Sequence, residues 1–562
     1  MSIATAQRES AAPRHLQGGA EFDVEVDIIV VGGGASGLPA ALFSRWLDNE
    51  VLLLEKAPEL GGTANKAAFW YWVPNNERMQ ELGLRDDEAS FLRYCARLAV
   101  PQAYDPDSPT LGMAQWEYDA CRAIYESASP AVELLAERDA LPYRHCEAVP
   151  DYWSELPEDA APTGRVFVPR DARESMSDGG LNGIRTLSAA ARRDGVDIRL
   201  GHRVQRLIMN GYAVVGVEAS TAGSAGLRAF ARKAVIFASG GFTHDVELRQ
   251  NYLSAPVFGG CAAMTNEGDF VRIGSAVGAQ LRNMNYAWMC PVPLEKAVAR
   301  RPDMIGMFSV AGDSMLFVDK HGRRVVNEKL PYNELAQKFF EWDPVAGQYP
   351  YLVMIQIWDQ RSQDHSASDE YGRLIVPEGA DDSHVIRGAT LPELTAAIGE
   401  RLTRYAQVTG GLALGPEFDS NLEASIARFN VLARSGVDAD FGRGERAVQQ
   451  LFNGDVREEP GRANPTMWPL SDSGPYYAAL VTGGTLDTKG GPKTSIDAQV
   501  LDDLNKPIPG LYGIGNCVAS PSRRAYWAGG ATIGPMIAFA YRAARTADQE
   551  PAKHASKQGV PA

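Results

Sequence analysis

Residues 26–37 read VDIIVVGGGASG, and this stretch specifies the first part of the fold. Its first six residues form an apolar, β-branched run that predicts a buried parallel strand. Gly32, Gly34 and Gly37 follow with G-x-G-x-x-G spacing, and an apolar helix is expected from there through Trp46. Such glycines permit a tight turn and let a pyrophosphate approach the backbone at a helix N-terminus. The stretch therefore predicts a dinucleotide-binding unit.

A second strand and an acidic residue complete this unit. Residues 51–54 are again apolar, and Glu55 ends the strand about 20 residues after the glycines. A carboxylate at this place can accept hydrogen bonds from the hydroxyls of a ribose. The residues that we expect to contact the cofactor here are Gly32, Gly34, Ala35, Ser36, Gly37 and Glu55.

Composition and charge exclude several classes of function. A chain of 562 residues is too long for one core, so we expect two domains. The net charge of −15 argues against a nucleic-acid partner, which needs a basic surface. Neither the six cysteines nor the eight histidines show metal-ligand spacing, so no metal site is expected.

The same features predict a cytoplasmic protein. Dispersed cysteines are typical of a reducing compartment. The polar N-terminus lacks the apolar core of a signal peptide, and no apolar run reaches the roughly 18 residues of a membrane span. Peripheral contact with a membrane through an apolar loop stays open.

The pattern along the chain predicts a dinucleotide-binding domain split by an inserted domain. Residues 75–140, 180–195, 391–408 and 420–435 are expected to be mostly helical, and 141–175 to form an ordered loop or lid. The predicted fold class is α/β, with a Rossmann-like dinucleotide-binding domain and an inserted α+β substrate domain. The predicted ranges are a disordered segment at 1–23, the dinucleotide-binding domain at 24–294 and 466–546, the substrate domain at 295–465, and a disordered tail at 547–562.

Three further segments point to FAD rather than a nicotinamide as the cofactor. Residues 55–63, EKAPELGGT, resemble the E-K-x-x-x-x-G-G-x-T/S run of flavoproteins with two dinucleotide-binding domains. Residues 238–242, ASGGF, resemble the second signature of that family, and residues 512–517, YGIGNC, resemble the third. A second G-x-G-x-x-G is missing, so the resemblance implies an external electron acceptor, such as a quinone.

The resemblance also implies the remaining cofactor contacts. No histidine lies near residues 61–70, so a covalent flavin link is not expected and the FAD is predicted to be non-covalent. The contacts implied are Lys56, Gly61, Gly62, Thr63, Ala64, Ala67, Val204, Ala238, Ser239, Gly240, Asp269, Gly515, Asn516, Ala531 and Ile533.

Within this superfamily, residues 25–545 resemble the 3-ketosteroid dehydrogenase and fumarate reductase branch. The segments that carry the likeness are VPNN at 73–76, PDYW at 150–153, NEKLPY at 327–332 and YWAGGATIGP at 526–535. Soluble fumarate reductases have an arginine shortly after the Asn-Glu pair. Here Tyr332 stands five residues after Asn327, as in the steroid dehydrogenases.

The resemblance implies a flavin-dependent 1,2-desaturation of a 3-ketosteroid or similar apolar ketone, an oxidation of a CH–CH bond. Tyr332 would remove the C2 proton with help from Tyr152, and flavin N5 would take the C1 hydride. Tyr526 and the Gly530 N–H would hold the C3 oxygen. A phenol has an ordinary pKa of about 10, so a neighbour that stabilises the phenolate is needed, and Tyr152 is the candidate.

Two other functions stay open at this point. The family usually has serine and three glycines where this chain has Ala67, Ala68, Phe69 and Trp70, so a substrate other than a steroid stays open. Arg523 and Arg524 are compatible with an enoate reductase of the fumarate or urocanate type. A flavin-binding scaffold that senses a ligand without turnover is the non-enzymatic alternative.

Overall fold

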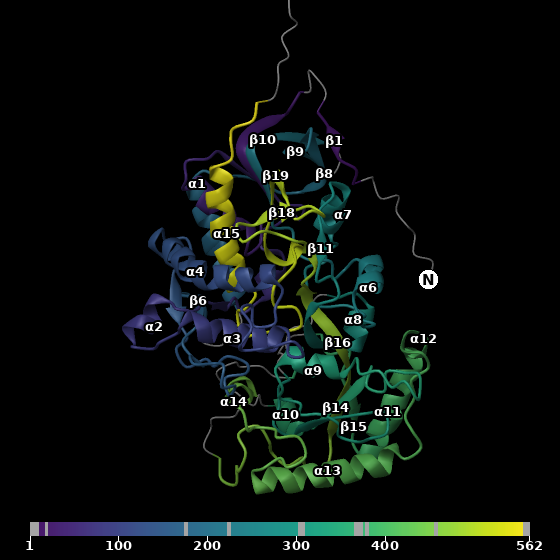
Figure 1. Ribbon diagram of the computed structural model, residues 1–562. Helices are drawn as coiled ribbons and strands as arrows, with labels where there is room; N and C mark the ends of the chain where they lie inside the picture. Colours follow the sequence, from purple (N-terminus) through teal and green to yellow (C-terminus); the bar gives the residue numbers. More distant parts are fainter. Residues whose placement is uncertain are drawn as a thin grey trace, which may run out of the picture.

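The structure is a computed structural model. It describes residues 11–16, 21–173, 178–221, 226–301, 310–364, 375–376, 381–453 and 459–554. The main sheet occupies the upper part of the molecule. A second sheet, which contains the long strand β16 (Tyr476–Thr488), occupies the lower part (Figure 1).

Nine strands form the main sheet among the described residues. The strands β10 (Leu227–Phe237), β2 (Val24–Val31), β3 (Val51–Leu54) and β7 (Asp197–Arg199) lie side by side and parallel. In this register Ile28 stands beside Val51 and Val31 beside Leu54. The apolar runs of β2 and β3 are therefore the centre of a parallel sheet, as predicted, and the α/β class is confirmed.

The remaining strands extend this sheet on the other side of β10. The antiparallel ribbon β8 (His202–Asn210) and β9 (Ala213–Thr221) continues it to β1 (Arg14–His15). The strand β19 (Pro507–Gly513) pairs parallel with β10 and carries β18 (Gln499–Leu501).

Helices cover one face of the main sheet. Side chains from α1 (Gly37–Arg45), α4 (Gln115–Glu137), α5 (Gly179–Arg193) and α15 (Ile533–Asp548) share one buried cluster with Ile28 and Val30. The alternate residues Ile29 and Val31 pack on the opposite face with β8, β9 and α7 (Asp269–Ala276). This two-sided burial is the reason that β2 shows no polar alternation in its second half.

The second sheet is antiparallel and has the order β12-β16-β14-β13, with β15 also pairing with β16. Its strands are β12 (Ala287–Pro293), β13 (Met315–Val318), β14 (Met354–Asp359), β15 (Ile386–Gly388) and β16. The helices α11 (Leu391–Arg404) and α13 (Phe418–Ser435) share a buried cluster with it.

Two strands of this sheet, β12 at its edge and β16 in its interior, lie outside the predicted substrate domain. Both β12 and β16 fall beyond the range 295–465, yet they pair with each other, from Ala287 opposite Thr488 to Pro293 opposite Val481. We propose that the inserted domain begins near residue 287 and ends near residue 488, because a sheet cannot be divided between two cores.

A smaller sheet and several helices occupy the chain segment between β3 and β7 of the main sheet. The strands β4 (Tyr71–Trp72), β5 (Tyr143–His145) and β6 (Val166–Pro169) form it, so residues 141–175 contain strands as well as the predicted loop. The helices α2 (Glu77–Glu81), α3 (Glu88–Ala99) and α4 agree with the helical prediction for 75–140. The predicted helices at 180–195, 391–408 and 420–435 correspond to α5, to α11 with α12 (Ala406–Thr409), and to α13.

The short elements that remain connect these parts. They are η1 (Gly62–Lys66), α6 (Val246–Tyr252), β11 (Leu281–Arg282), α8 (Leu294–Val298), α9 (Tyr332–Lys338), α10 (Gln360–Asp364), α14 (Ala447–Asn453), β17 (Gly491–Pro492) and η2 (Gly515–Cys517).

The two chain ends differ from the prediction where they are described. Residues 14–15, expected to be disordered, form β1, which pairs parallel with β8 through Arg14 and Ile208. The last helix, α15, continues to Asp548, two residues past the predicted boundary, because Ala543, Ala544 and Ala547 are buried in the core. The second half of the predicted tail, residues 555–562, lies outside the described residues.

Candidate active site

One cavity of about 250 Å³ contains most of the residues predicted from the sequence. It opens at the carboxyl ends of β2 and β3 and extends to the ends of β12 and β16, so both sheets contribute to its wall. The predicted cofactor residues that line it are Gly32, Gly34, Ala35, Ser36, Glu55, Lys56, Gly61, Gly62, Thr63, Ala64, Ala67, Val204, Ala238, Ser239, Gly240, Asp269, Asn516 and Ile533.

Three predicted cofactor residues do not line this cavity. Gly515 and Ala531 line a smaller neighbouring cavity of about 50 Å³. Gly37 lies behind the glycine turn, where an added Cβ would stand 1.8 Å from the Gly32 carbonyl oxygen. Glycine is therefore required at position 37 because it lets the helix pack closely on the strand, and not because it contacts a ligand.

The turn after β2 has a shape that fits a pyrophosphate. Gly32 adopts φ +107°, and a Cβ there would approach the Ala238 oxygen to 2.4 Å. At Gly34, by contrast, an added Cβ would meet only the Gly61 oxygen, at 3.6 Å. The turn therefore packs tightly against the sheet at Gly32 but leaves free space on the cavity side at Gly34. This space lies at the N-terminal end of α1.

Glu55 is fixed by backbone amides beside this turn. Its carboxylate accepts 2.8 Å hydrogen bonds from the Gly33 N–H and from the Ala57 N–H. Next to it, the Lys56 ammonium forms a 2.8 Å ion pair with Asp269 on α7. The donors and acceptors needed by a ribose and a diphosphate therefore stand along one edge of the cavity.

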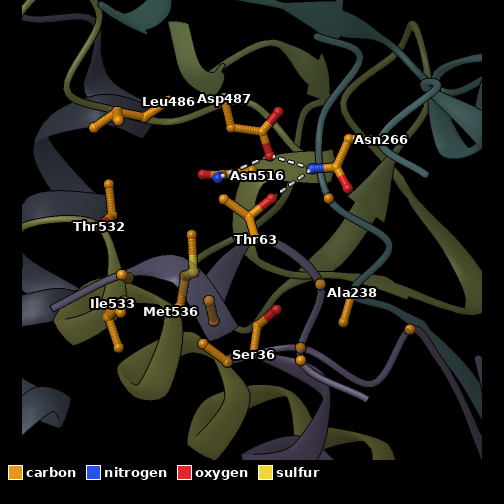
Figure 2. A pocket seen from close by; sticks show the side chains of 18 of the residues that line it. Ser36, Thr63, Ala238, Asn266, Leu486, Asp487, Asn516, Thr532, Ile533 and Met536 are labelled. Carbon is orange, nitrogen blue, oxygen red and sulfur yellow. Dashed lines mark hydrogen bonds between the residues drawn. The ribbon is translucent and has the colours of Figure 1, made fainter. Parts of the chain in front are cut away.

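A polar network that the sequence did not reveal crosses the middle of the cavity (Figure 2). The buried Asp487 carboxylate accepts hydrogen bonds from the side-chain amides of Asn266, at 2.7 Å, and Asn516, at 3.1 Å. The Asn266 amide also lies 3.3 Å from the Thr63 hydroxyl. Thr63 and Asn516 are among the predicted cofactor residues, but no local pattern marks Asp487, which enters from the end of β16.

Three tyrosines meet at the end of the cavity away from the glycine turn. The Tyr152 hydroxyl donates a 2.8 Å hydrogen bond to the Tyr332 hydroxyl. The Tyr526 ring lies 5.3 Å from the Tyr152 ring and 5.2 Å from the Tyr332 ring, between ring centres. All three line the cavity together with Gly530, so the four residues with predicted catalytic roles are brought together.

The environment of these hydroxyls is apolar. Tyr152 and Tyr526 are buried, in one cluster with Trp288 and Val448. Burial raises the pKa of Tyr332 well above its ordinary value and also raises the pKa of Tyr526. Both phenols are therefore neutral hydrogen-bond donors unless a neighbour stabilises the phenolate.

Tyr332 is held by a buried charge network beside strand β13 of the second sheet. Glu328, four residues earlier, forms ion pairs with Arg324 at 2.8 Å and Arg443 at 3.1 Å. Arg324 also pairs with Asp438 at 2.8 Å. The adjacent arginines hold the pKa of Glu328 at about 2, below the ordinary value, so the carboxylate stays charged and anchors the segment that ends in Tyr332.

Tyr152 is held by a second buried network. Arg165 forms ion pairs with Asp86 at 2.7 Å and Asp159 at 3.0 Å, and it also pairs with Asp151. Asp151, the residue before Tyr152, accepts a 2.9 Å hydrogen bond from the Trp72 indole. The irregular loop at 150–161 is therefore fixed by these charges together with backbone hydrogen bonds, such as the one from the Tyr152 N–H to the Trp527 carbonyl at 3.0 Å.

Gly530 stands in the turn before α15 and must be glycine. It adopts φ +86°, and an added Cβ would approach the carbonyl carbon of Trp70 to 2.6 Å. Trp527, by contrast, does not line this cavity. Its ring stacks on Trp72 at 5.8 Å, in the core cluster around Phe91, so its bulk is accommodated in the core.

The departure at residues 67–70 does reach the cavity. Phe69 and Trp70 both line it, and Phe69 adopts φ +57°, a conformation that glycine reaches without strain. The Trp70 indole packs directly on Gly529, where an added Cβ would lie 2.2 Å from the ring. The large side chains occupy space that small residues would leave open.

Comparison with known proteins agrees with this arrangement. The family model described as "FAD binding domain" matches residues 27–533. The chain is 28% identical to 4-oxocyclohexanecarboxylate 2-dehydrogenase of Sinomonas cyclohexanicum over 92% of each chain. It is also 28% identical to 3-oxosteroid 1-dehydrogenase of Mycobacterium tuberculosis, over 93% of this chain and 99% of the relative.

A solved structure shows the same fold. The 3-ketosteroid Δ1-dehydrogenase from Sterolibacterium denitrificans, in complex with 1,4-androstadiene-3,17-dione, has a TM-score of 0.76 and 25% identity. The match covers 93% of this chain and 99% of that chain. Because the family model spans most of the chain and the glycine turn and Glu55 fit its cofactor, this chain belongs to the FAD binding domain family, and its cofactor is FAD.

Proposed function

We propose that the protein is an FAD-dependent oxidoreductase that desaturates a cyclic ketone of the 3-ketosteroid type next to its carbonyl group. The observation that carries the proposal is the meeting of Tyr152, Tyr332, Tyr526 and Gly530 in the cavity that also contains the FAD-binding turn. The relatives named 3-oxosteroid 1-dehydrogenase support the reaction class.

Tyr332 acts as the base that removes the proton from the carbon next to the carbonyl. A buried phenol is a poor base because its pKa is raised. The hydrogen bond from the Tyr152 hydroxyl stabilises the phenolate, so the pair can hold a negative charge that Tyr332 alone could not hold.

Tyr526 and the Gly530 N–H bind the carbonyl oxygen. Removal of the neighbouring proton shifts negative charge onto this oxygen, and two donors already aimed at it lower the cost of that charge. The turn at Gly32 and Glu55 would hold the FAD, which when bound would supply the two-electron oxidant for the departing hydride. An external acceptor such as a quinone then takes the electrons.

Two classes of ketone, which differ in size, are candidates for the substrate. The steroid class is favoured by the two steroid dehydrogenases described above. A single-ring ketone is the second candidate, because Phe69 and Trp70 fill part of the cavity and one relative is named for a cyclohexanone acid. For both, the reacting ring and its carbonyl would meet the same tyrosines.

The arrangement of cations disfavours the fumarate-type alternative. Arg523 forms a 2.7 Å ion pair with Glu117, and Arg524 donates a 2.6 Å hydrogen bond to Gln337. Neither lines the described cavity. A dicarboxylate needs cationic anchors at the reacting centre, and Tyr332 stands where the reductases have an arginine.

Anaerobic reduction of the purified holoprotein tests the proposal. A 3-ketosteroid and a 4-oxocyclohexanecarboxylate would be mixed separately with the oxidised enzyme, and loss of the yellow flavin absorption would be followed. We expect at least one ketone to bleach the flavin, with formation of the corresponding enone. Reoxidation of the reduced flavin by fumarate without any reaction with ketones would favour an enoate reductase, and no reaction in either direction would favour a sensing scaffold.

The cellular location of the enzyme is also part of the proposal. Among the described residues, no helix has the length and apolar character needed to cross a bilayer. We propose a cytoplasmic enzyme that meets apolar substrates or a quinone at a membrane surface. Recovery of the enzyme with sedimented lipid vesicles, compared with recovery without vesicles, would test this contact.

A further inference from the structure

Lys489 is a fully buried lysine that the proposed chemistry does not use. It follows the long strand β16, and its side chain is 0% exposed. Its ammonium lies 3.7 Å from the centre of the Trp288 ring and donates a 2.9 Å hydrogen bond to the Arg523 carbonyl. It also donates to the Ala525 carbonyl. Trp288 contacts the Tyr526 ring, and the two carbonyls belong to the turn just before Tyr526.

The first connection runs through the backbone before Tyr526. Arg523 adopts φ +47°, a left-handed conformation that a residue other than glycine keeps only where its surroundings enforce it. Lys489 binds the carbonyls on both sides of residue 524, and the Asn333 amide binds the Arg524 carbonyl at 3.1 Å. The turn that carries Tyr526 is thus held from two elements.

The second connection runs through Trp288. Its ring meets the Tyr526 ring edge to face at 4.8 Å and 64°, and its indole N–H donates a 3.0 Å hydrogen bond to Asn516. The Lys489 amino group, whose pKa burial lowers well below its ordinary value, lies over the ring and limits its movement. Trp288 is therefore held by Lys489 and Asn516, and its ring forms a wall beside the Tyr526 ring.

We infer that Lys489 is a positioning residue that fixes the Tyr526 hydroxyl for the carbonyl oxygen by holding both the turn at 523–525 and the Trp288 ring. This inference rests on the proposed role of Tyr526. A displacement of about 1 Å of a group that binds the transition state can lower a rate on the order of 100-fold. Lys489 would achieve its effect without touching the substrate.

The test is a double-mutant cycle on the rate of anaerobic flavin reduction by the ketone. In the otherwise native enzyme, Lys489→Met should lower the limiting rate by roughly 10- to 100-fold, with the apparent dissociation constant of the ketone changed less than about threefold. Bound FAD per protein should be unchanged. In a Tyr526→Phe background, the same substitution should change the rate less than about threefold, because its target is already absent.

A matched control is Lys233→Met. The Lys233 ammonium also makes two polar contacts, with Asn49 and Asp548 at 2.7 Å, but it lies at the main sheet away from the cavity. This variant should react like the native enzyme in both backgrounds. Equal rate losses for Lys489→Met with and without the Tyr526 hydroxyl would overturn the inference, since they would indicate a general structural defect.

Failure of the inference can be distinguished from failure of the proposed function. If Tyr526→Phe alone reduces its flavin at the native rate, the role of Tyr526 is wrong. If Tyr526→Phe lowers the rate of flavin reduction, but Lys489→Met lowers it by the same factor in the native and the Tyr526→Phe backgrounds, only the role of Lys489 is wrong. Should Lys489→Met fail to fold, Trp288→Phe can replace it in the double-mutant cycle with Tyr526→Phe. An equal loss of the reduction rate from Trp288→Phe with and without the Tyr526 hydroxyl would likewise refute the positioning role.

Discussion

The hydroxyls of Tyr152 and Tyr332 lie 2.8 Å apart, with Tyr152 as the donor, although the two residues are separated by 180 positions in the chain. Each stands at the end of its own buried charge network, around Arg165 for Tyr152 and around Glu328 for Tyr332. The pair is therefore fixed from both sides, which is the condition for stabilising a phenolate in an apolar cavity.

Replacing Tyr332 by phenylalanine removes the proposed base without enlarging the side chain. We expect Tyr332→Phe to lower the rate of flavin reduction by about 10²- to 10⁴-fold, the usual contribution of general base catalysis. Bound FAD should stay at the native level, since Tyr332 lies at the end of the cavity away from the glycine turn. Flavin absorption of the purified protein and stopped-flow reduction measure the two quantities.

A suitable control is Tyr349→Phe, because Tyr349 packs on Trp342 outside the cavity. It should keep the native rate. Native turnover in Tyr332→Phe would remove Tyr332 from the mechanism.

The rate of flavin reduction should rise with pH. The base acts as the phenolate, whose fraction increases about tenfold per pH unit below the pKa. Since burial raises the pKa of Tyr332, the plateau should lie in the alkaline range and the neutral range should remain on the slope. Reduction at saturating ketone between about pH 6 and 10 measures this profile, and a pH-independent rate would contradict a phenolate base.

Loss of the Glu55 charge should weaken binding of FAD. Glu55→Gln removes a carboxylate that accepts from the Gly33 and Ala57 amides and faces the predicted ribose. A hydrogen bond to a charged group contributes about 1.5–3 kcal/mol, so we expect the dissociation constant of FAD to rise roughly 10- to 100-fold. Titration calorimetry of apoprotein with FAD measures it. Glu59→Gln, at an exposed position nearby, is the control, and equal affinities of the two variants would exclude this role for Glu55.

Arg165 should be essential for stability. Arg165→Met would leave Asp86, Asp151 and Asp159 buried without their cation. Removing one partner of a buried ion pair typically costs about 3–5 kcal/mol, so the thermal unfolding midpoint should fall by several degrees. The exposed Arg170, 3.8 Å from Asp171, provides the control Arg170→Met, which should melt like the native protein. An unchanged midpoint for Arg165→Met would show that the network does not hold the Tyr152 loop.

The FAD-binding half of the protein follows from the amino-acid sequence alone. The glycine turn, the strand before it and Glu55 are contiguous or nearly so, and their conformations follow from local rules: glycine for a positive φ and a β-branched run for a buried parallel strand. For this reason the residue pattern alone predicts Gly32, Gly34 and Glu55 as cofactor residues. The tyrosines could be named as candidates only because short segments around them resemble a known family.

The construction of the catalytic end, by contrast, depends on the tertiary structure. Asp487, Trp288 and Lys489 carry no local signal, because their importance comes from the pairing of strands β12 and β16, which places Trp288 opposite Asp487. The same holds for the borders of the inserted domain, which depend on the pairing of these strands. Whether two hydroxyls meet, or a lysine reaches a distant turn, depends on packing between segments remote in the chain, and local sequence patterns contain no information about such contacts.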